Sequence, residues 1–197
     1  MKKIIIVLII SILLIGCTNK KNTIIENDII QNNHEDNELL NIFNKAIENS
    51  NQNLELIAPL GEQVVAGKNY MFLTTSNQTY KIVVIYHDLQ GNSTITSIKD
   101  FDYNKYINNN SEPNTSNLSG SWYVNSYNYT IKDETIKKYF DKPIENIKYK
   151  PIIELENKII LCYGENIETN KLYIYIAIMS ENKKEIKTSY VDISDFL

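Results

Sequence analysis

At residues 61–70 the chain reads Gly-Glu-Gln-Val-Val-Ala-Gly-Lys-Asn-Tyr, which sets two β-branched apolar residues between two glycines. The flanking segments Leu54 to Pro59 and Tyr70 to Thr75 have the composition of strands, and a glycine can supply the positive φ of a tight hairpin between them. Val64 and Val65 are therefore expected close to the hairpin tip. Apolar side chains held in water on a stiff turn are typical of a surface that enters another molecule's groove.

A helix precedes this hairpin and two more strands follow it. Between Asn37 and Ser50 the apolar residues recur at helical spacing and form one stripe: Leu39, Leu40, Phe43, Ala46 and Ile47. Strands are expected at Thr79 to His87 and at Ser93 to Lys99. The first of these is apolar or aromatic at nearly every position, as in a central strand. One helix packed on an antiparallel sheet is the simplest arrangement.

Residues 63–70 resemble the first inhibitory hairpin of the cystatins, which carries Gln-Val-Val-Ala-Gly followed shortly by Asn-Tyr. The order of elements is also similar to that family, since the hairpin follows a helix and precedes further strands. The resemblance extends over about Asp36 to Tyr103. It implies an α+β fold and a reversible inhibitor of papain-like cysteine proteases. The residues that it implies for protease binding in this hairpin are Gln63, Val64, Val65, Ala66 and Gly67.

A second turn runs from His87 to Asn92 and carries an apolar residue, Leu89, in its middle. Because successive antiparallel strands return the chain to the same end of the sheet, this turn should lie beside the first hairpin. The cystatins also use a second hairpin there, so the resemblance adds to the protease-binding surface Leu89, Gln90 and Gly91. His87 has a weaker claim as a catalytic or metal-binding group, since no nucleophile accompanies it in the sequence. The cystatins' third contact is a glycine before the helix, and Thr18 to Leu60 contains no glycine.

Residues 1–16 have the features of a secretory signal, with two lysines before an apolar run, Ile4 to Ile15, that is too short to span a bilayer. The next segment, Leu14-Ile15-Gly16-Cys17, resembles the bacterial lipobox, in which the cysteine receives acyl chains such as palmitate and becomes the mature N-terminus. We therefore expect a lipoprotein, anchored through Cys17 to the cell membrane or the outer membrane, with residues 17–35 as a tether. The alternative is a plain signal peptide followed by a coincidental cysteine.

The second half repeats the plan of the first. Residues 140–146 read Phe-Asp-Lys-Pro-Ile-Glu-Asn and parallel Phe-Asn-Lys-Ala-Ile-Glu-Asn at 43–49. Four strands are expected after this repeat: about Tyr149 to Leu155, Lys158 to Tyr163, Lys171 to Met179 and Glu185 to Asp192. The sequence therefore predicts an α+β fold with two tandem cystatin-like domains, each with one helix packed on an antiparallel β-sheet.

The predicted boundaries place the first domain at 36–103, a linker rich in Asn and Ser at 104–120, and a degenerate second domain at 121–197. Trp122, near the start of the second domain, is expected to be a packing anchor. In the copy, a charged turn at 155–158 replaces the valine hairpin and another at 180–184 replaces the second turn. Charged groups enter an apolar cleft poorly. Its expected role is a spacer or a second binding module.

Composition favours a binding protein over an enzyme. A net charge of −4 without any arginine argues against a nucleic-acid partner. The chain has two cysteines, so an acylated Cys17 leaves no disulfide, and Cys162 lies in an apolar run typical of a buried strand. No phosphate loop, paired metal motif or nucleophile elbow is present, which predicts no catalytic residues, no metal and no cofactor. Two functions remain: a protease inhibitor, or a surface-exposed binding or adhesion lipoprotein that only shares the fold.

Overall fold

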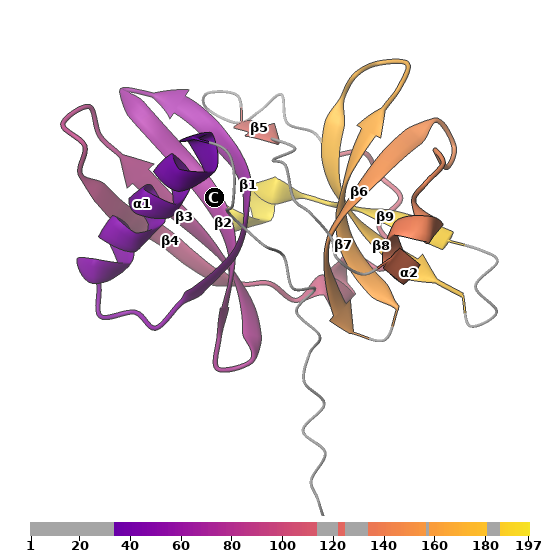
Figure 1. The fold of residues 1–197 in the computed structure, drawn as a ribbon, viewed down its shortest axis with the longest axis horizontal. Helices are drawn as coiled ribbons and strands as arrows, with labels where there is room; N and C mark the ends of the chain where they lie inside the picture. The colour runs from indigo at the N-terminus through magenta and orange to yellow at the C-terminus, as the bar shows by residue number, and fades with distance from the viewer. Residues whose placement is uncertain (1–33, 114–121, 125–133, 157, 181–185) are drawn as a thin grey trace, which may run out of the picture.

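The structure of the protein is a computed structural model, which describes residues 34–113, 122–124, 134–156, 158–180 and 186–197. These residues form two antiparallel β-sheets with a helix on the outer side of each, a broadly α+β fold (Figure 1). The fold class expected from the sequence is confirmed at this coarse level. The predicted signal peptide, Cys17 and nearly all of the predicted tether lie outside the described residues.

The first half of the chain builds a five-stranded sheet around the hairpin. Its strands are β1 (Glu55–Val65), β2 (Gly67–Ser76), β3 (Thr79–His87), β4 (Ser93–Asp100) and β5 (Trp122–Val124). Their order across the sheet is β4-β3-β2-β1-β5, and every neighbouring pair is antiparallel. The four strands expected here are present. Strand β5, which the sequence assigned to the second domain, lies at the edge of this first sheet beside β1.

Helix α1 (His34–Glu48) lies across one face of this sheet. The spacing predicted most of its buried stripe, but Ile42 is buried and Leu40 is only half-buried. Phe43 packs edge-on against Phe72 of β2, with ring centroids 5.5 Å apart. The helix therefore buries a stripe made of Leu39, Ile42, Phe43 and Ala46.

The second half forms a four-stranded antiparallel sheet in the order β6-β7-β8-β9. Its strands are β6 (Ile147–Glu156), β7 (Ile159–Asn166), β8 (Leu172–Met179) and β9 (Ile186–Val191), close to the expected bounds. Helix α2 (Glu134–Tyr139) precedes them and has only 6 residues, against 15 in α1. Pro143 follows soon after, and proline cannot continue a helical hydrogen-bond ladder, which agrees with the short helix.

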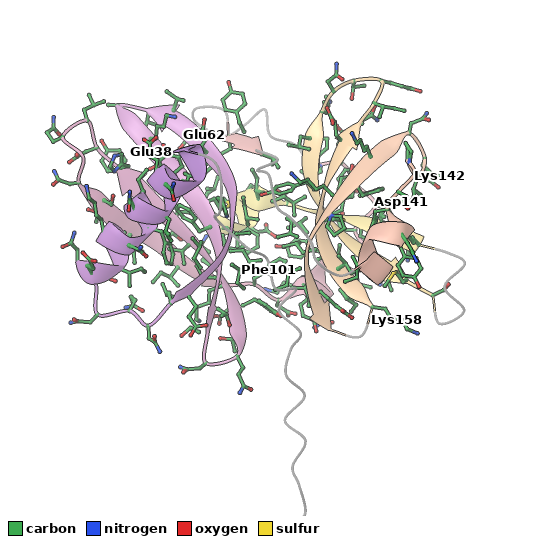
Figure 2. All side chains as sticks on the ribbon, viewed as in Figure 1. Glu38, Glu62, Phe101, Asp141, Lys142 and Lys158 are labelled. Carbon is green, nitrogen blue, oxygen red and sulfur yellow. The ribbon has the colours of Figure 1, made fainter. Side chains whose placement is uncertain are left out.

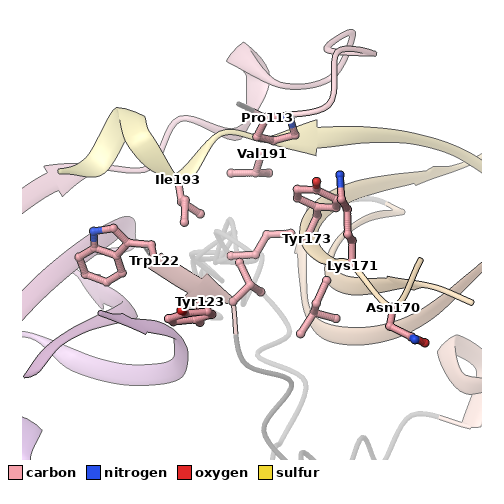
Figure 3. Close-up of a pocket in the computed structure, with 11 residues that line it drawn as sticks. Pro113, Trp122, Tyr123, Asn170, Lys171, Tyr173, Val191 and Ile193 are labelled. Carbon is pink, nitrogen blue, oxygen red and sulfur yellow. The ribbon is translucent and has the colours of Figure 1, made fainter. Parts of the chain in front are cut away.

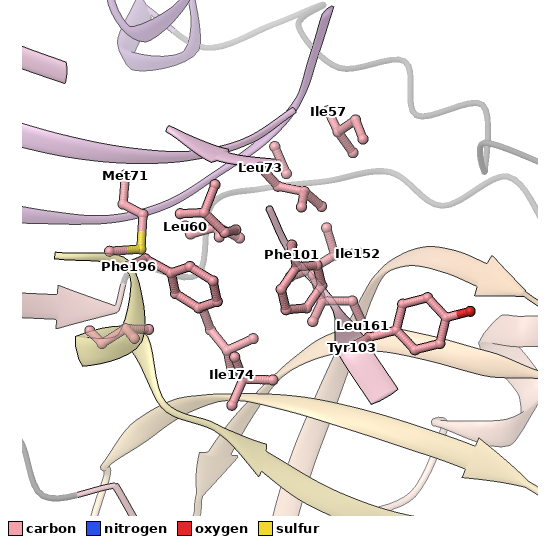
Figure 4. Packing of buried hydrophobic residues seen from close by; sticks show 14 of the residues in the cluster. Ile57, Leu60, Met71, Leu73, Phe101, Tyr103, Ile152, Leu161, Ile174 and Phe196 are labelled. Atoms are coloured by element: carbon pink, nitrogen blue, oxygen red, sulfur yellow. The ribbon is translucent and has the colours of Figure 1, made fainter. Parts of the chain in front are cut away.

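The two sheets pack face to face and share one hydrophobic core (Figure 4). In β3, Ile82 and Val84 belong to this shared core, while Val83 and Ile85 pack under α1. A strand buried on both faces needs apolar residues at nearly every position, as the sequence of β3 has. The layers are therefore α1, the first sheet, the second sheet and α2 (Figure 1). From the second sheet the shared core takes Ile152, Ile153, Leu155, Leu161, Tyr163, Ile174, Ile176 and Val191.

Part of the predicted linker belongs to this packed structure. After the short turn η1 (Tyr103–Lys105), Tyr106 is buried and its hydroxyl donates a hydrogen bond to an Asp195 carboxylate oxygen at 2.6 Å. Farther on, the Asn109 carbonyl accepts a hydrogen bond from the backbone N–H of Tyr190 at 2.9 Å, so this segment lies along β9. Residues 114–120 lie outside the described residues. The domain boundaries at 103 and 121 remain predictions about independent folding, while the described halves are joined through a common core.

Candidate functional site

The β1–β2 hairpin turns within a single residue. Val65 pairs with Gly67 across the hairpin, which leaves Ala66 at the tip. Gly67 has a φ of +120°, and a side chain there would meet β3, because a Cβ would lie 2.5 Å from the His87 carbonyl oxygen. The prediction that both valines are exposed is confirmed, since 60% of Val64 and 41% of Val65 are accessible to solvent.

The β3–β4 turn lies beside this tip. Lys68, near the start of β2, pairs with His87 at the end of β3, so both turns are at the same end of the first sheet (Figure 1). The Tyr86 hydroxyl donates a hydrogen bond to the Ala66 carbonyl oxygen at 2.5 Å and ties the two hairpins together. Leu89 is 80% exposed on the second turn. We call this end of the sheet the hairpin end, and its exposed residues include Val64, Val65, Ala66 and Leu89.

Asp88 holds the second turn in place. Its carboxylate accepts hydrogen bonds from the backbone N–H groups of Gln90 and Asn92 at 2.9 and 2.8 Å, and from the Asn92 side-chain amide at 2.8 Å. These bonds, those from Asn92 above all, favour the charged carboxylate and lower the pKa of Asp88. Gly91 has a φ of +85°, a conformation that suits glycine. Leu89 is therefore presented on a turn with a defined shape, between Asp88 and an exposed Gln90.

Gln63 lies apart from the other predicted contact residues. Only 6% of it is exposed, and its side-chain oxygen accepts a hydrogen bond from the Asn69 amide at 2.7 Å. It stands opposite Trp122 in the pairing of β1 with β5, and Trp122 belongs to the core shared by the two sheets. The Gln63 side chain therefore helps to fix neighbouring strands, and the tip residues that follow it are the accessible ones.

An ion pair flanks the exposed valines. Lys68 pairs with Val64 across the hairpin. Its ammonium lies 3.5 Å from the Glu62 carboxylate and 5.8 Å from the centroid of the Tyr70 ring. Both charged groups are partly exposed, so the pair contributes at most about 1 kcal/mol to stability. It places a polar border beside the apolar tip, as the rims of protein interfaces commonly have.

The corresponding turn of the second half lies elsewhere. Lys158 follows β6 in the β6–β7 turn with a φ of +66°, and Figure 2 shows it far from Glu62 of the hairpin end, at the other side of the molecule. The second charged turn expected from the sequence, at 180–184, falls mostly outside the described residues. Lys158 is therefore not positioned to extend the surface around Val64 and Val65.

Cys162 and His87 are residues whose chemistry could support catalysis. Cys162 is fully buried on β7, its Sγ lies 3.7 Å from the Tyr175 carbonyl oxygen, and burial raises the pKa of its thiol well above the usual range. His87 Nδ1 lies 3.0 Å from the Ser93 hydroxyl oxygen.

In the part of the chain that the structure describes, no group of three His, Cys, Asp or Glu side chains could hold a metal ion. Nor does any helix among those residues have the length and apolar character to cross a membrane.

A cavity of about 330 Å³ lies between β5 and the second sheet (Figure 3). Trp122 and Tyr123 line one side of it, and Lys171 and Tyr173 line another. The polar groups of the latter two are engaged, since Glu112 accepts hydrogen bonds from the Tyr173 hydroxyl and from Lys171 Nζ, the second at 3.0 Å. No sequence pattern predicts this cavity, because its walls come from segments far apart in the chain.

One exposed aromatic residue beside the hairpin was not expected. Tyr123 is 55% exposed on β5, where it pairs with Glu62 of β1. One local signal points to this exposure. Neighbouring residues of a strand face opposite sides, so a buried Trp122, the expected packing anchor, implies that Tyr123 faces away from the core. The sequence contains no signal for the pairing with β1, which brings Tyr123 to the hairpin end.

No family model, curated protein or solved structure matches this chain. The likeness of residues 63–70 to the cystatin hairpin therefore stays a resemblance. Function must be inferred from that pattern together with the geometry of the hairpin end.

Proposed function

We propose that the protein is a reversible inhibitor of papain-like cysteine proteases, held on the bacterial cell envelope by an acyl anchor on Cys17. The observation that carries this proposal is the exposure of Val64, Val65 and Leu89 on two adjacent turns. A group of apolar side chains on stiff turns is suited to a narrow, largely apolar cleft. The residue pattern at 63–70 supports the same proposal.

The shape of the hairpin accounts for inhibition without cleavage. The β1–β2 tip is fixed by strand pairing and by the Tyr86–Ala66 hydrogen bond, so its backbone cannot extend along the cleft as a substrate does. A rigid turn loses little conformational entropy on binding, so more of the contact energy appears as affinity. Full burial of one valine side chain contributes about 1.5–3 kcal/mol, and an interface of standard size buries about 1,600 Å² in total.

Two departures from the cystatin pattern restrict the contact surface. Thr18 to Leu60 contains no glycine for a contact before the helix, and Gln63 is buried beside β5. We therefore assign protease contact to the accessible tip residues: Val64, Val65, Ala66, Gly67, Leu89, Gln90 and Gly91. The same two departures favour a second candidate function, in which a surface-exposed binding or adhesion lipoprotein presents the hairpin end to a different protein.

Inhibition of papain by a soluble chain from Thr18 to Leu197 tests the proposal, because this form contains every described residue and lacks the anchor. We expect competitive, reversible inhibition with the chain uncut after long incubation. A serine protease assayed in parallel controls for non-specific loss of activity. Full papain activity at high concentrations of the chain would reject the inhibitor and leave the binding lipoprotein.

A further inference from the structure

The exposed apolar side chains are concentrated at the hairpin end. Within the described ranges, six large apolar side chains are exposed: Val64, Val65, Leu89, Tyr123, Ile167 and Leu197. The first three form the proposed wedge. Tyr123 comes from the second half of the sequence, yet β5 pairs with β1 only a few residues from the tip. Single exposed apolar residues need no explanation, but a fourth beside the wedge makes a patch.

Tyr123 shares a face of the first sheet with Val64. It pairs directly with Glu62 in the antiparallel register of β1 and β5. Residues two apart on a strand face the same side, so Val64 stands diagonally across from Tyr123. Such diagonal neighbours lie about 7–8 Å apart, within reach of an aromatic side chain. A partner that covers Val64 from this side would therefore also meet Tyr123.

The backbone that carries Tyr123 is fixed by its neighbours. The pairs Gly61–Val124, Glu62–Tyr123 and Gln63–Trp122 join β5 to β1, and the Trp122 side chain is buried in the shared core. Gly61 permits a close approach of the two strands, since a Cβ at this position would lie 2.6 Å from the Tyr123 carbonyl oxygen. A tyrosine held on such a rigid backbone binds a partner at low entropic cost.

An edge strand does not require an aromatic residue at this position. Exposed edges are commonly protected by charged side chains, lysine above all, and the chain is rich in lysine. Tyr123 instead offers an apolar ring for burial and a hydroxyl for hydrogen bonding at a wet rim. Tyrosine is also enriched among the residues that dominate binding energy at protein interfaces.

We propose that Tyr123 is a third contact of the inhibitory surface and binds the rim of the same protease cleft that the wedge enters. This inference rests on the proposed function. The protease is the expected occupant because Tyr123 continues the face of Val64, bordered by the Glu62–Lys68 ion pair. Strand β5 thereby supplies a contact to a chain that has no glycine between Thr18 and Leu60.

The test measures the inhibition constant for papain with the full chain, kept in solution by a mild detergent. Tyr123→Thr removes the ring but keeps a strand-forming residue, and it is expected to weaken inhibition about tenfold. Tyr123→Phe keeps the ring and should stay within about threefold of the parent, since it removes one hydroxyl. The matched control is Ile167→Thr, at a 50% exposed position of the second half, which should leave inhibition unchanged.

Each outcome decides the proposal. A loss of inhibition in Tyr123→Thr alone, with unchanged thermal melting, supports the third contact. Equal inhibition by the parent and Tyr123→Thr overturns it and leaves the wedge intact. A loss that comes with lowered melting assigns Tyr123 a structural role and also overturns it. A parent that does not inhibit papain at all overturns both the third contact and the proposed function.

Discussion

The hydroxyl of Tyr163, on β7 of the second sheet, donates a hydrogen bond to the backbone carbonyl oxygen of Pro59, on β1 of the first sheet. Tyr163 is almost fully buried and belongs to the core that both sheets share. In the opposite direction, the Tyr80 hydroxyl of β3 donates to the carbonyl oxygen of Leu155 on β6 at 3.4 Å. Each sheet therefore helps to satisfy backbone groups of the other, at a place where an unsatisfied buried group costs about 1–3 kcal/mol.

Tyr163→Phe should lower the stability of the whole protein. The variant keeps the ring in the core but removes the donor to Pro59, so we expect a loss of about 1–2 kcal/mol in the free energy of unfolding. Urea unfolding measures it. Tyr123→Phe, which removes the same hydroxyl from an exposed ring, is the control and should change stability by less than about 0.5 kcal/mol. Equal stabilities for the two variants would contradict a role for the buried bond.

The shared core also predicts that the two halves unfold together. A fragment of residues 34–113 would expose the apolar face that the second sheet covers, including Leu60, Met71 and Val84. We expect one calorimetric transition for the full chain and no stable fold for the fragment, contrary to the two independent domains that the sequence suggested. A fragment with a dispersed amide NMR spectrum would contradict this and support the boundaries at 103 and 121.

Local sequence patterns predicted the elements well and their assembly less well. In β3 the alternation of Ile82 and Val84 with Val83 and Ile85 defines two apolar faces. One face could be assigned to the preceding helix, because the helix has its own apolar stripe nearby in sequence. The other face is covered by strands of the second half, and contacts between distant segments leave no periodic signal in either strand.

Some features of the candidate site likewise follow from local sequence, and others depend on contacts between distant segments. The exposure of Val64 and Val65 follows from their position beside a glycine turn, which is local information. The burial of Gln63 and the position of Tyr123 both depend on β5 lying beside β1. That pairing joins residues far apart in the chain, so neither position could be predicted from the residues around it.

The second turn should lose its order at acid pH. Hydrogen bonds from Asn92 and Gln90 hold the pKa of Asp88 below its ordinary value of 3.8. A carboxylate with a depressed folded-state pKa stabilises the fold above the ordinary value, and that contribution is lost as pH falls through the depressed value. Exchange protection of the Gln90 and Asn92 amides should therefore be constant between about pH 7 and 5 and fall below about pH 4. Amide NMR across this range measures it.

Asp88→Asn is the control for this pH dependence, because it removes the titrating group and keeps an oxygen that can accept one backbone hydrogen bond. The variant should show no step in amide protection in this pH range. A step in the parent with its midpoint above 3.8 would contradict the hydrogen-bond geometry around Asp88.

The proposed anchor predicts that the Cys17 side chain decides whether the protein partitions into a detergent phase. Full-length protein made in a bacterium should enter the detergent-rich phase, because each buried CH₂ of an acyl chain contributes about 0.8 kcal/mol to membrane binding. Cys17→Ala should move the protein to the aqueous phase. Cys162→Ala, which leaves the lipobox intact, is the control and should stay with the detergent. Retention of Cys17→Ala in the detergent phase would contradict the lipoprotein.

Val65→Asp should separate folding from binding at the hairpin end. Val65 is 41% exposed beside the turn, so its replacement should change the free energy of unfolding by no more than about 0.5 kcal/mol. Binding should suffer far more, since an unpaired carboxylate forced into an apolar cleft costs upwards of about 2 kcal/mol, or more than tenfold in the inhibition constant. Thermal melting and papain inhibition measure the two effects on the same preparations.

Two matched variants, one at an exposed position and one in the core, serve as references for interpreting Val65→Asp. Ile167→Asp puts the same charge on a 50% exposed residue of the second half, and it should change neither melting nor inhibition. Val83→Asp puts the charge under α1, where a buried unpaired carboxylate should unfold the protein. If Val65→Asp behaves like Val83→Asp, the valine is part of the core. If it behaves like Ile167→Asp while the parent inhibits papain, the tip does not enter the cleft. Unchanged melting with lost inhibition is the result that agrees with valines exposed for binding.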